Sequence, residues 1–444
     1  MVSDPGPAAW GASGWWKCGS GIPAAGERWQ SAVSEPERGN MVAGQAGTHV
    51  FPVDVVIIGG CGRVGLPFGV ALATRGLSVR LYDLNAAVVG TVNDGRMPFT
   101  EEGADEPLRA AVADGSLVAT TDPAVVGTAE VLVVVVGTPV DEHLNPDLAA
   151  VPAALDRCSG HLVDGQLVIL RSTVHPTVTA LTERMLNKRG MQVDVAFCPE
   201  RIAEGHAMTE LFSLPQIVGA RTERAGDRAE KFFRVLTDEI IRLAPEEAEL
   251  AKLFTNTWRY IKFATANQFW MMSNDYGLDF ERIRQAIRQD YPRAADMPGA
   301  GLAAGPCLLK DTMQLAAFNQ NKFVLGHSAM LINEGLPLYI VSRLEEQFDL
   351  PSLTVGVLGM AFKAGSDDPR ESLSYKLRKI LLMKAGETLC SDPYIADERF
   401  TPLDEVLARA DLLVIASPHP EYRDLVTDKP VADIWGITGR GTRI

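Results

Sequence analysis

Short apolar runs alternate with helical patterns through the first half of the chain. Residues 53–58 form the first run, and a glycine-rich turn, a helical pattern over residues 66–75 and a second run over residues 78–82 follow it. Later runs cover residues 131–136, 166–170 and 193–197. The run over residues 131–136 is apolar at every position, which predicts a strand buried on both faces, as in a parallel sheet with helices on each side. We therefore expect an α/β fold with an N-terminal Rossmann-type domain over residues 51–244.

The pattern changes to long helices at about residue 245. Residues 246–276 have a helical period and contain neither glycine nor proline, and a second long helix is expected over residues 328–348. Large apolar side chains throughout these segments are typical of buried or interface helices, which predicts a central all-α dimerisation region over residues 245–350. Apolar strands return at residues 354–358, 388–390 and 412–416. They predict a smaller C-terminal α/β domain over residues 351–444.

Composition places the chain among ordinary soluble globular proteins. Its 444 residues predict two or three domains, and 46% of them are hydrophobic while 22% are charged. The first 50 residues are rich in Gly, Ala, Ser and Pro without any period, and they lack the basic start and apolar core of a signal peptide. We expect a disordered extension there. The six cysteines include no CxxC pair and no metal-ligand spacing, which favours a reduced, cytoplasmic protein without a bound metal.

The charge of the chain limits its partners. A formal net charge of −14 argues against nucleic acid or an anionic membrane surface as the main partner. No apolar run approaches the roughly 18 residues that a membrane span requires. If the ligand is itself an anion, the lysines and arginines that bind it must be gathered locally.

A dinucleotide fingerprint occupies the first strand–turn–helix unit. Gly60, Gly62 and Gly65 form G-x-G-x-x-G between the first strand and the first helix, and Asp83 ends the second strand. In this motif the first glycine makes the tight turn, the second admits the pyrophosphate and the third allows close helix–strand packing. The pyrophosphate would sit at the helix N-terminus, which places Val64 among the cofactor-binding residues. A carboxylate at Asp83 would accept from the ribose hydroxyls and repel a 2′-phosphate, so we expect NAD.

Polar residues follow three of the later predicted strands. Thr138, Thr173 and the pair Glu200 and Glu204 each come shortly after one of these runs. Each residue alone is typical of a cap or a turn. The carboxyl ends of parallel strands meet at one edge of a sheet, where ligands bind, so the four together predict a ligand site.

A second candidate site lies in the stretch of residues 299–311, which reads GAGLAAGPCLLKD. Its small residues would let backbone N–H groups approach a ligand closely. Cys307 is followed one helical turn later by Lys310 and Asp311, which makes it a candidate for an activated nucleophile. The alternative is a glycine-rich turn that leads into a helix with a buried cysteine.

Short motifs in a fixed order extend this picture along the chain. They are Gly60-x-Gly62-x-x-Gly65, Gly137-Thr138-Pro139, Ser172-Thr173-Val174, Pro199-Glu200 with Glu204-Gly205, Lys252-x-x-x-Asn256, Cys307-x-x-Lys310-Asp311, and Ala361-Phe362-Lys363 with Arg370-Glu371-Ser372. From residue 53 to the C-terminus, this order resembles the nucleotide-sugar 6-dehydrogenases, the family of UDP-glucose and GDP-mannose dehydrogenases. The resemblance implies an NAD-binding domain, a central dimerising region and a nucleotide-sugar-binding C-terminal domain.

The resemblance also implies a four-electron oxidation of a primary alcohol to an acid, with two molecules of NAD. Cys307 would capture the intermediate aldehyde as a thiohemiacetal, and oxidation of this adduct would give a thioester that water hydrolyses. Lys252 and Asn256, which share one helix face, would hold the oxyanion of the tetrahedral adducts. A thiol needs nearby cations or a helix N-terminus to react at neutral pH.

Further roles follow from the same resemblance. Asp311 and Thr173 would position the hydrolytic water or carry its proton, and Glu200 would act as general base. The residues that match NAD contacts are Thr138, Thr173, Glu204, Lys310 and Arg370. The residues that match nucleotide-sugar contacts are Glu200, Arg201, Lys252, Asn256, Gly301, Gly305, Lys363 and Arg293, the last of which would reach across a homodimer or higher homo-oligomer.

Departures from the family pattern bear on the substrate. Arg201 resembles the N-acetylhexosamine branch, whereas residues 307–311 resemble the glucose branch. Ala303 and Ala304 replace a pair that usually includes glycine. We expect UDP-glucose or dTDP-glucose, oxidised to the glucuronate for polysaccharide or glycoside biosynthesis. The alternatives are a UDP-N-acetylhexosamine, a two-electron hydroxyacid-type dehydrogenase, and an inactive nucleotide-sugar-binding module.

Overall fold

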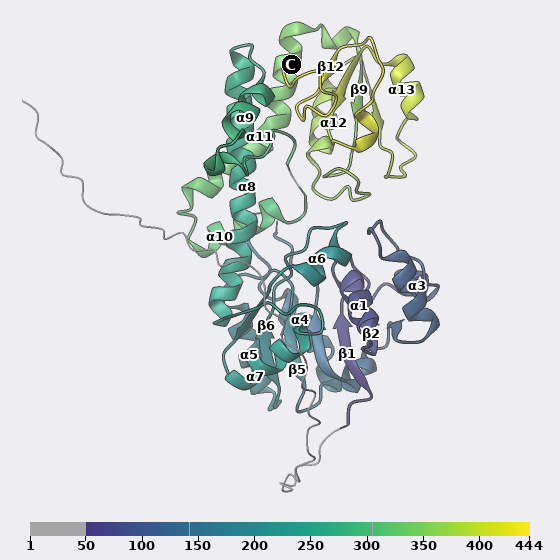
Figure 1. The fold of residues 1–444 in the computed structure, drawn as a ribbon, viewed down its shortest axis with the longest axis vertical. Helices are drawn as coiled ribbons and strands as arrows, with labels where there is room; N and C mark the ends of the chain where they lie inside the picture. The colour runs from purple at the N-terminus through teal and green to yellow at the C-terminus, as the bar shows by residue number, and fades with distance from the viewer. Residues whose placement is uncertain (1–49, 142, 304) are drawn as a thin grey trace, which may run out of the picture. The chain divides into compact units, whose positions relative to one another are not determined.

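The computed structural model describes residues 50–141, 143–303 and 305–444, so all but the last residue of the expected N-terminal extension lies outside the described residues. Eight strands of the described chain form one sheet: β1 (Val53–Ile58), β2 (Val79–Tyr82), β3 (Leu117–Thr120), β4 (Ala129–Val134), β5 (Leu167–Leu170), β6 (Asp194–Phe197), β7 (Gln216–Ala220) and β8 (Ile240–Leu243). Their order is β3-β2-β1-β4-β5-β6-β7-β8 (Figure 1). The first six are parallel, while β7 runs antiparallel to β6. This is the Rossmann order with two added strands, which confirms the expected fold class.

Helices cover both faces of this sheet. One face packs against α1 (Gly65–Thr74), α3 (Asp105–Ala113), α6 (Ala207–Ser213) and α7 (Glu223–Phe233), and the other against α4 (Ala150–Arg157) and α5 (Val178–Lys188). Ile57 and Val133 belong to the first core, whereas their chain neighbours Val56 and Leu132 belong to the second. All four side chains are fully buried. Successive strand residues point to opposite faces, so two covered faces require apolar residues at every position.

The central region is helical. Its helices are α8 (Pro245–Asp275), α9 (Phe280–Arg288), α10 (Leu308–Phe318) and α11 (Val324–Gln347), and α8 packs against both α10 and α11. Pro245 occupies the first turn of α8, and Gly277, with φ of +69°, follows its C-terminus. Proline and left-handed glycine are the residues that these two ends favour.

α11 is also the one helix among residues 50–141, 143–303 and 305–444 that is long and apolar enough to cross a membrane. Polar residues interrupt its apolar stretch, so it contains no continuous apolar run of that length. Leu336, Ile340 and Leu344 on α11 are at most 1% exposed and pack in a protein core. Core helices of globular proteins pass the same test, and one side of α11 packs in such a core.

The C-terminal segment forms a second sheet. Its strands are β9 (Thr354–Leu358), β10 (Glu387–Ser391), β11 (Leu412–Ile415) and β12 (Val431–Ala432), in the all-parallel order β10-β9-β11-β12. The helices α12 (Leu373–Lys384) and α13 (Leu403–Arg409) accompany it. Val355 of β9 and Leu377 of α12 share one hydrophobic core with Trp270 of α8. The smaller α/β domain predicted from the sequence is therefore present, and its core is continuous with the central helices.

Candidate active site

The glycine loop after β1 is tightly packed at two of the three fingerprint glycines. A Cβ atom on Gly60 would lie 2.8 Å from that of Leu81 on β2, and one on Gly65 would lie 2.8 Å from the carbonyl oxygen of Gly59. The nearest atom to a Cβ on Gly62 would be 3.8 Å away. The residue with positive φ in this turn is Gly59, at +78°, one position before the fingerprint begins. The packing leaves space at Gly62, where the motif places a pyrophosphate.

The surroundings of this loop fit NAD. Asp83 follows β2, and its carboxylate accepts from the N–H groups of Cys61 and Asn85, each at 3.1 Å. Val64 is the N-cap residue of α1, where no side chain caps the helix and no acidic residue lies in the first turn. These features leave the helix start available to an anion and a carboxylate available to a ribose. Cys61 is a spacer, because burial and the charge of Asp83 raise the pKa of its thiol to about 12.

Two predicted threonines at the sheet edge are linked to the cysteine-bearing helix. Thr138 follows β4, and its Oγ1 donates to the carbonyl oxygen of Thr173 after β5 at 2.6 Å. Lys310 Nζ, from the first turn of α10, donates to Thr138 Oγ1 at 3.4 Å. The same ammonium group lies 2.8 Å from Asp311 Oδ1. The structure thus brings four predicted residues together from three separate motifs.

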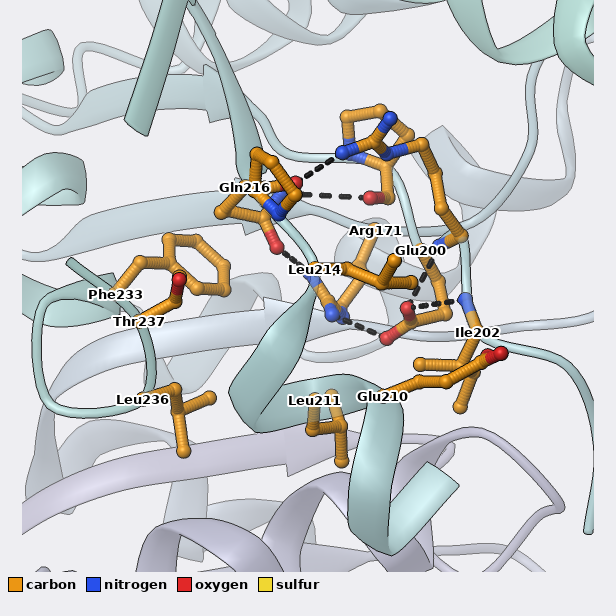
Figure 2. Close-up of a pocket in the computed structure, with 13 residues that line it drawn as sticks. Arg171, Glu200, Ile202, Glu210, Leu211, Leu214, Gln216, Phe233, Leu236 and Thr237 are labelled. Carbon is orange, nitrogen blue, oxygen red and sulfur yellow. Dashed lines mark hydrogen bonds and ion pairs between the residues drawn. The ribbon is translucent and has the colours of Figure 1, made fainter. Parts of the chain in front are cut away.

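Glu200, the predicted general base, is held by a buried arginine. Arg171 follows β5, is 2% exposed and donates to the carboxylate of Glu200. Its other contacts are the carbonyl oxygen of Cys198 at 3.1 Å and Gln216 Oε1 at 3.0 Å. The second carboxylate oxygen of Glu200 accepts from the next two backbone N–H groups at 2.6 and 2.9 Å. Figure 2 shows the Arg171 and Glu200 side chains directed toward one another.

A small cavity beside this ion pair is lined by Arg171, Glu200, Arg201 and Phe233, among others. The guanidinium of Arg171 lies over the rings of Phe68 and Phe233, at 4.3 and 5.1 Å from their centroids. Arg201, predicted to contact the substrate, lines the same cavity and donates to the carbonyl oxygen of Pro215. Burial lowers the pKa of Arg201 from its ordinary value.

Glu204 joins the glycine loop to the C-terminal segment. Arg63, inside the glycine loop, donates to Glu204 Oε1 and to Asp367 Oδ1, both at 2.8 Å. Lys363 Nζ donates to the carbonyl oxygen of Glu204, and Arg370 Nη2 lies 3.9 Å from its carboxylate. Burial raises the pKa of Glu204, although Arg63 acts in the opposite direction. Lys363, predicted to bind the nucleotide sugar, and Arg370, predicted to bind NAD, therefore both lie beside Glu204, which is itself predicted to bind NAD.

Cys307 ends the second glycine loop at the start of α10. It is the N-cap residue of this helix and is exposed, and its carbonyl oxygen accepts from the Asp311 N–H at 2.8 Å. Asp311 is fully buried, and its Oδ2 accepts from Asn256 Nδ2 at 2.6 Å. Lys252, one turn earlier on α8, is 9% exposed. The residues predicted to surround the nucleophile are therefore buried beside the helix that it caps.

The surroundings of Cys307 and Lys252 bring the pKa values of the thiol and the ammonium group closer together. Desolvation raises the pKa of Cys307, and Asp311 adds to this shift, whereas Lys310, Lys252 and Arg370 oppose it. Burial lowers the pKa of Lys252, against the opposing charges of Asp311 and Cys307. A raised thiol pKa and a lowered ammonium pKa make proton transfer between such groups easier.

Aromatic rings pack directly against Gly301 and Gly305 in the second glycine loop, where a larger residue would not fit. A Cβ on Gly301 would lie 2.3 Å from the ring of Trp435, and one on Gly305 would lie 2.5 Å from the ring of Phe362. The N–H of Gly301 donates to Asn267 Oδ1 on α8 at 2.8 Å. Both glycines, predicted to contact the substrate, thus also fix the loop against α8 and the C-terminal domain. Ala304 lies outside the described residues.

Arg293, predicted to reach a partner subunit, lies at the surface. It belongs to a short 3₁₀ turn (Pro292–Ala294), and its guanidinium stacks over Tyr291 at 5.6 Å. α8 exposes large apolar side chains, namely Phe254, Trp258, Phe269 and Met272. The surface of the region expected to dimerise is therefore unusually apolar for an exposed helix.

Sequence reasoning gave no role to several residues that hold this site together. Arg63 is the one charged residue of the glycine loop, and Arg171 directly follows an apolar run, so both carried a sequence signal. Asn267 stood out as a polar residue within an apolar helix. Glu249 and Glu101 are buried and accept backbone N–H groups near Thr173 and Glu204, and no sequence pattern distinguishes them from surface acids.

Three domain models of one protein family match consecutive parts of the chain. The NAD binding domain model of the UDP-glucose/GDP-mannose dehydrogenase family matches residues 53–237. The central domain model of that family matches residues 246–334, and its UDP binding domain model matches residues 356–440.

Individual relatives cover most of the chain. It is similar to the UDP-N-acetyl-D-mannosamine dehydrogenase of Pyrococcus horikoshii, with 31% identity over 86% of this chain and 98% of that protein. An NDP-N-acetyl-D-galactosaminuronic acid dehydrogenase of Ralstonia nicotianae is 30% identical over 83% and 92% of the two chains. Among solved structures, the P. horikoshii UDP-D-ManNAc dehydrogenase has a TM-score of 0.80 at 29% identity, covering 85% of this chain and 94% of that one. The UDP-glucose dehydrogenase of Pyrobaculum islandicum has the same TM-score and identity, over 88% and 95%.

Proposed function

The chain belongs to the UDP-glucose/GDP-mannose dehydrogenase family and is an NAD-dependent nucleotide-sugar 6-dehydrogenase, and we propose that its substrate is a UDP-N-acetylhexosamine. UDP-N-acetylmannosamine is the first candidate, since several relatives that span most of this chain carry that activity in their names. Arg201, which resembles the N-acetylhexosamine branch, agrees with it. This proposal replaces the glucose substrate expected from the sequence.

The observation that carries the four-electron reaction is the cluster at the start of α10. Lys252 and Asp311 act electrostatically on the Cys307 thiol, and Asn256 is fixed by its bond to Asp311. A two-electron dehydrogenase needs no thiol at this position. The cluster is thus arranged for an enzyme that captures its own aldehyde intermediate.

The first part of the proposed mechanism is thiol addition. Lys252, whose pKa is lowered, accepts the proton of Cys307 as sulfur adds to the aldehyde carbon. The aldehyde oxygen becomes an oxyanion, and the Lys252 ammonium and Asn256 amide then donate hydrogen bonds to it. The alcohol oxidation that precedes this addition releases a hydride, which NAD would accept when bound, and a hydroxyl proton, which passes to water. The oxyanion of the adduct then gives up the second hydride and becomes the thioester.

The second part is hydrolysis of the thioester. Water adds to the acyl carbon, the carbon–sulfur bond breaks, and Cys307 leaves as a thiolate that regains a proton. Lys252 and Asn256 again hold the oxyanion, while Asp311 holds Asn256 in place. Glu200 accepts the proton of the water as general base, while Asp311 and Thr173 position the water or relay its proton. Glu200 accepts hydrogen bonds from Arg171 and from two backbone N–H groups. A substitution of Glu200 would therefore disturb the structure of the site as well as remove the general base.

The substrate diphosphate needs cations, which an acidic protein must gather. We assign this role to Lys363 and to Arg293 of a second copy, with Arg201 and the loop of Gly301 and Gly305 beside the sugar. The exposed apolar residues of α8 support a homodimer or a larger homo-oligomer in which Arg293 reaches the neighbouring site.

A substrate panel tests this proposal. Initial rates of NADH formation would be measured with UDP-N-acetylmannosamine, UDP-N-acetylglucosamine, UDP-glucose, dTDP-glucose and GDP-mannose. We expect the preferred UDP-N-acetylhexosamine to exceed UDP-glucose in kcat/KM by roughly tenfold or more, as a contact to the acetamido group would give. A higher kcat/KM for UDP-glucose would overturn the assignment. UDP-glucose is the second candidate because residues 307–311 resemble the glucose branch.

A further inference from the structure

Asp392 ties together the strand ends of the C-terminal sheet. It follows β10, and one carboxylate oxygen accepts from the N–H groups of Met360 and Ala361, after β9, at 2.6 and 3.0 Å. The other oxygen accepts from Tyr394 and Ile395 at 2.8 and 3.0 Å. The side chain is fully buried. A buried carboxylate with this many backbone donors fixes the loops that supply them.

His419 extends this anchor to the far end of the loop after β9. It follows β11, its side chain is fully buried, and its Nε2 lies 3.1 Å from Asp392 Oδ2. Its Nδ1 accepts from the Gly365 N–H at 3.1 Å. Because Nδ1 accepts a hydrogen bond, the proton of the neutral ring is on Nε2, where it is donated to Asp392. The rings of Tyr394 and Tyr422 pack around the imidazole at 5.0 and 5.7 Å.

The two anchors lie on either side of Lys363. Asp392 holds residues 360 and 361, and His419 holds Gly365, whose φ is +62°. Between them, the Phe362 N–H donates to the carbonyl oxygen of Asp368 at 3.1 Å. The position of the lysine is therefore set by a short loop that is bonded at both ends to one buried pair.

We propose that His419 is a positioning residue for nucleotide-sugar binding, which acts by holding Gly365 and thereby Lys363. This inference rests on the proposed function, because Lys363 is assigned there to the substrate diphosphate. His419 lies beneath the loop and acts only through it. A ring that merely filled the core would contribute to stability, whereas a positioning residue also sets the affinity for the nucleotide.

Two amide substitutions separate the two bonds of His419. The amide oxygen of Asn occupies the place of imidazole Nδ1, so His419→Asn keeps an acceptor for Gly365. The amide nitrogen of Gln occupies the place of Nε2, so His419→Gln keeps a donor to Asp392 and leaves the Gly365 N–H without its partner. Tyr422→Phe is the matched control, because it removes another buried hydrogen bond, to the carbonyl oxygen of Ser391 at 3.3 Å, in the same core.

Calorimetric titration of the full chain with UDP, and separately with NAD, provides the test. We expect His419→Gln to weaken UDP binding roughly three- to tenfold, as the loss of one hydrogen bond would, while His419→Asn and Tyr422→Phe stay within about twofold of wild type. NAD affinity should fall less than UDP affinity in His419→Gln and stay unchanged in the other two variants, because the loop reaches the NAD residues indirectly, through the bonds of Asp367 to Arg63 and of Lys363 to Glu204. Equal UDP affinity of His419→Gln and wild type, or an equal loss of NAD affinity, would overturn the inference.

Amide hydrogen exchange of residues 360–368 without ligand gives an independent result. We expect faster exchange in His419→Gln than in wild type and His419→Asn. Unchanged exchange would refute the anchor even if UDP bound. If wild type binds no UDP, the proposed nucleotide assignment fails, and the exchange data alone then decide whether His419 holds the loop.

Discussion

Arg171 offers a sharp test of how the sheet edge is built. The substitution Arg171→Met keeps much of the side-chain length but removes the charge that faces Glu200. The carbonyl oxygen of Cys198 and the Gln216 amide also lose a donor. Glu200 is only 9% exposed, so its carboxylate would remain largely out of water with two backbone donors and without its ion-pair partner.

The size of this effect follows from the burial of the pair. Breaking a buried ion pair by removing one partner costs about 3–5 kcal/mol, because the remaining charge is left without compensation. We expect Arg171→Met to lower the free energy of unfolding by about 4 kcal/mol on that basis. Adding Glu200→Gln removes the stranded charge and keeps an acceptor for the backbone donors. The double variant should therefore regain about half of the loss, or about 2 kcal/mol.

Urea unfolding followed by far-UV circular dichroism measures these differences. Arg234→Met is the control, since it removes a half-exposed i,i+4 pair with Glu230 and should cost only about 0.5 kcal/mol. A loss below about 1 kcal/mol in Arg171→Met, in the range of a surface pair, would contradict the reasoning. So would a double variant that is no more stable than the single one, because the stranded charge would then not be the cause.

Three further predictions concern the nucleophile and its loop. Alkylation of Cys307 by iodoacetamide can be followed by peptide mass spectrometry. Its rate should still increase above pH 9.0, because the pKa of the thiol is raised and the thiolate forms only at high pH. Lys252→Met removes a cation that lowers this pKa, so the reaction at pH 8 should be slower in that variant. A rate that levels off below pH 9.0 would contradict the raised pKa. Asn256→Ala should lower kcat by about 10²- to 10³-fold, as the loss of one oxyanion donor does, with the Kd for NAD unchanged, and a near-normal kcat would remove Asn256 from that role. Gly301→Ala should cost about 1–3 kcal/mol of stability, because its Cβ would lie 2.3 Å from the Trp435 ring, and an unchanged Tm would show that the ring can move aside.

Much of the fold was predictable because it rests on local patterns. The apolar runs that became β1, β4 and β5 needed burial on both faces, and only a parallel sheet between helices provides it. β3, β7 and β8 were not predicted. β3 and β8 are only partly buried, and β7 begins with Gln216 and contains Gly219, so none of them is a continuous apolar run. The left-handed turn at Gly59 was also missed, because this glycine precedes the fingerprint and packs against Val135 instead.

The site was predictable as a set of residues but not as a set of contacts. Periodicity placed Lys252 and Asn256 on one helix face, and strand ends placed Thr138 and Thr173 at one edge. The contacts that build the site join residues 29 to 304 positions apart. They are the Asn256–Asp311 hydrogen bond, the Arg171–Glu200 ion pair and the bonds of Arg63 to Glu204 and Asp367. Such contacts depend on how the elements pack, which no local pattern encodes. The sugar is also beyond local patterns, because residues that resemble two different branches occur in one chain.

The central claim is that Cys307 captures an aldehyde so that one enzyme completes a four-electron oxidation. The most direct measurement is the yield of NADH per molecule of the best nucleotide sugar, with the sugar limiting, in wild type and in Cys307→Ser. We predict two NADH and a carboxylate product for wild type, and retained NAD binding without acid formation for Cys307→Ser. One NADH with an aldehyde product in wild type, or normal acid formation in Cys307→Ser, would contradict the account.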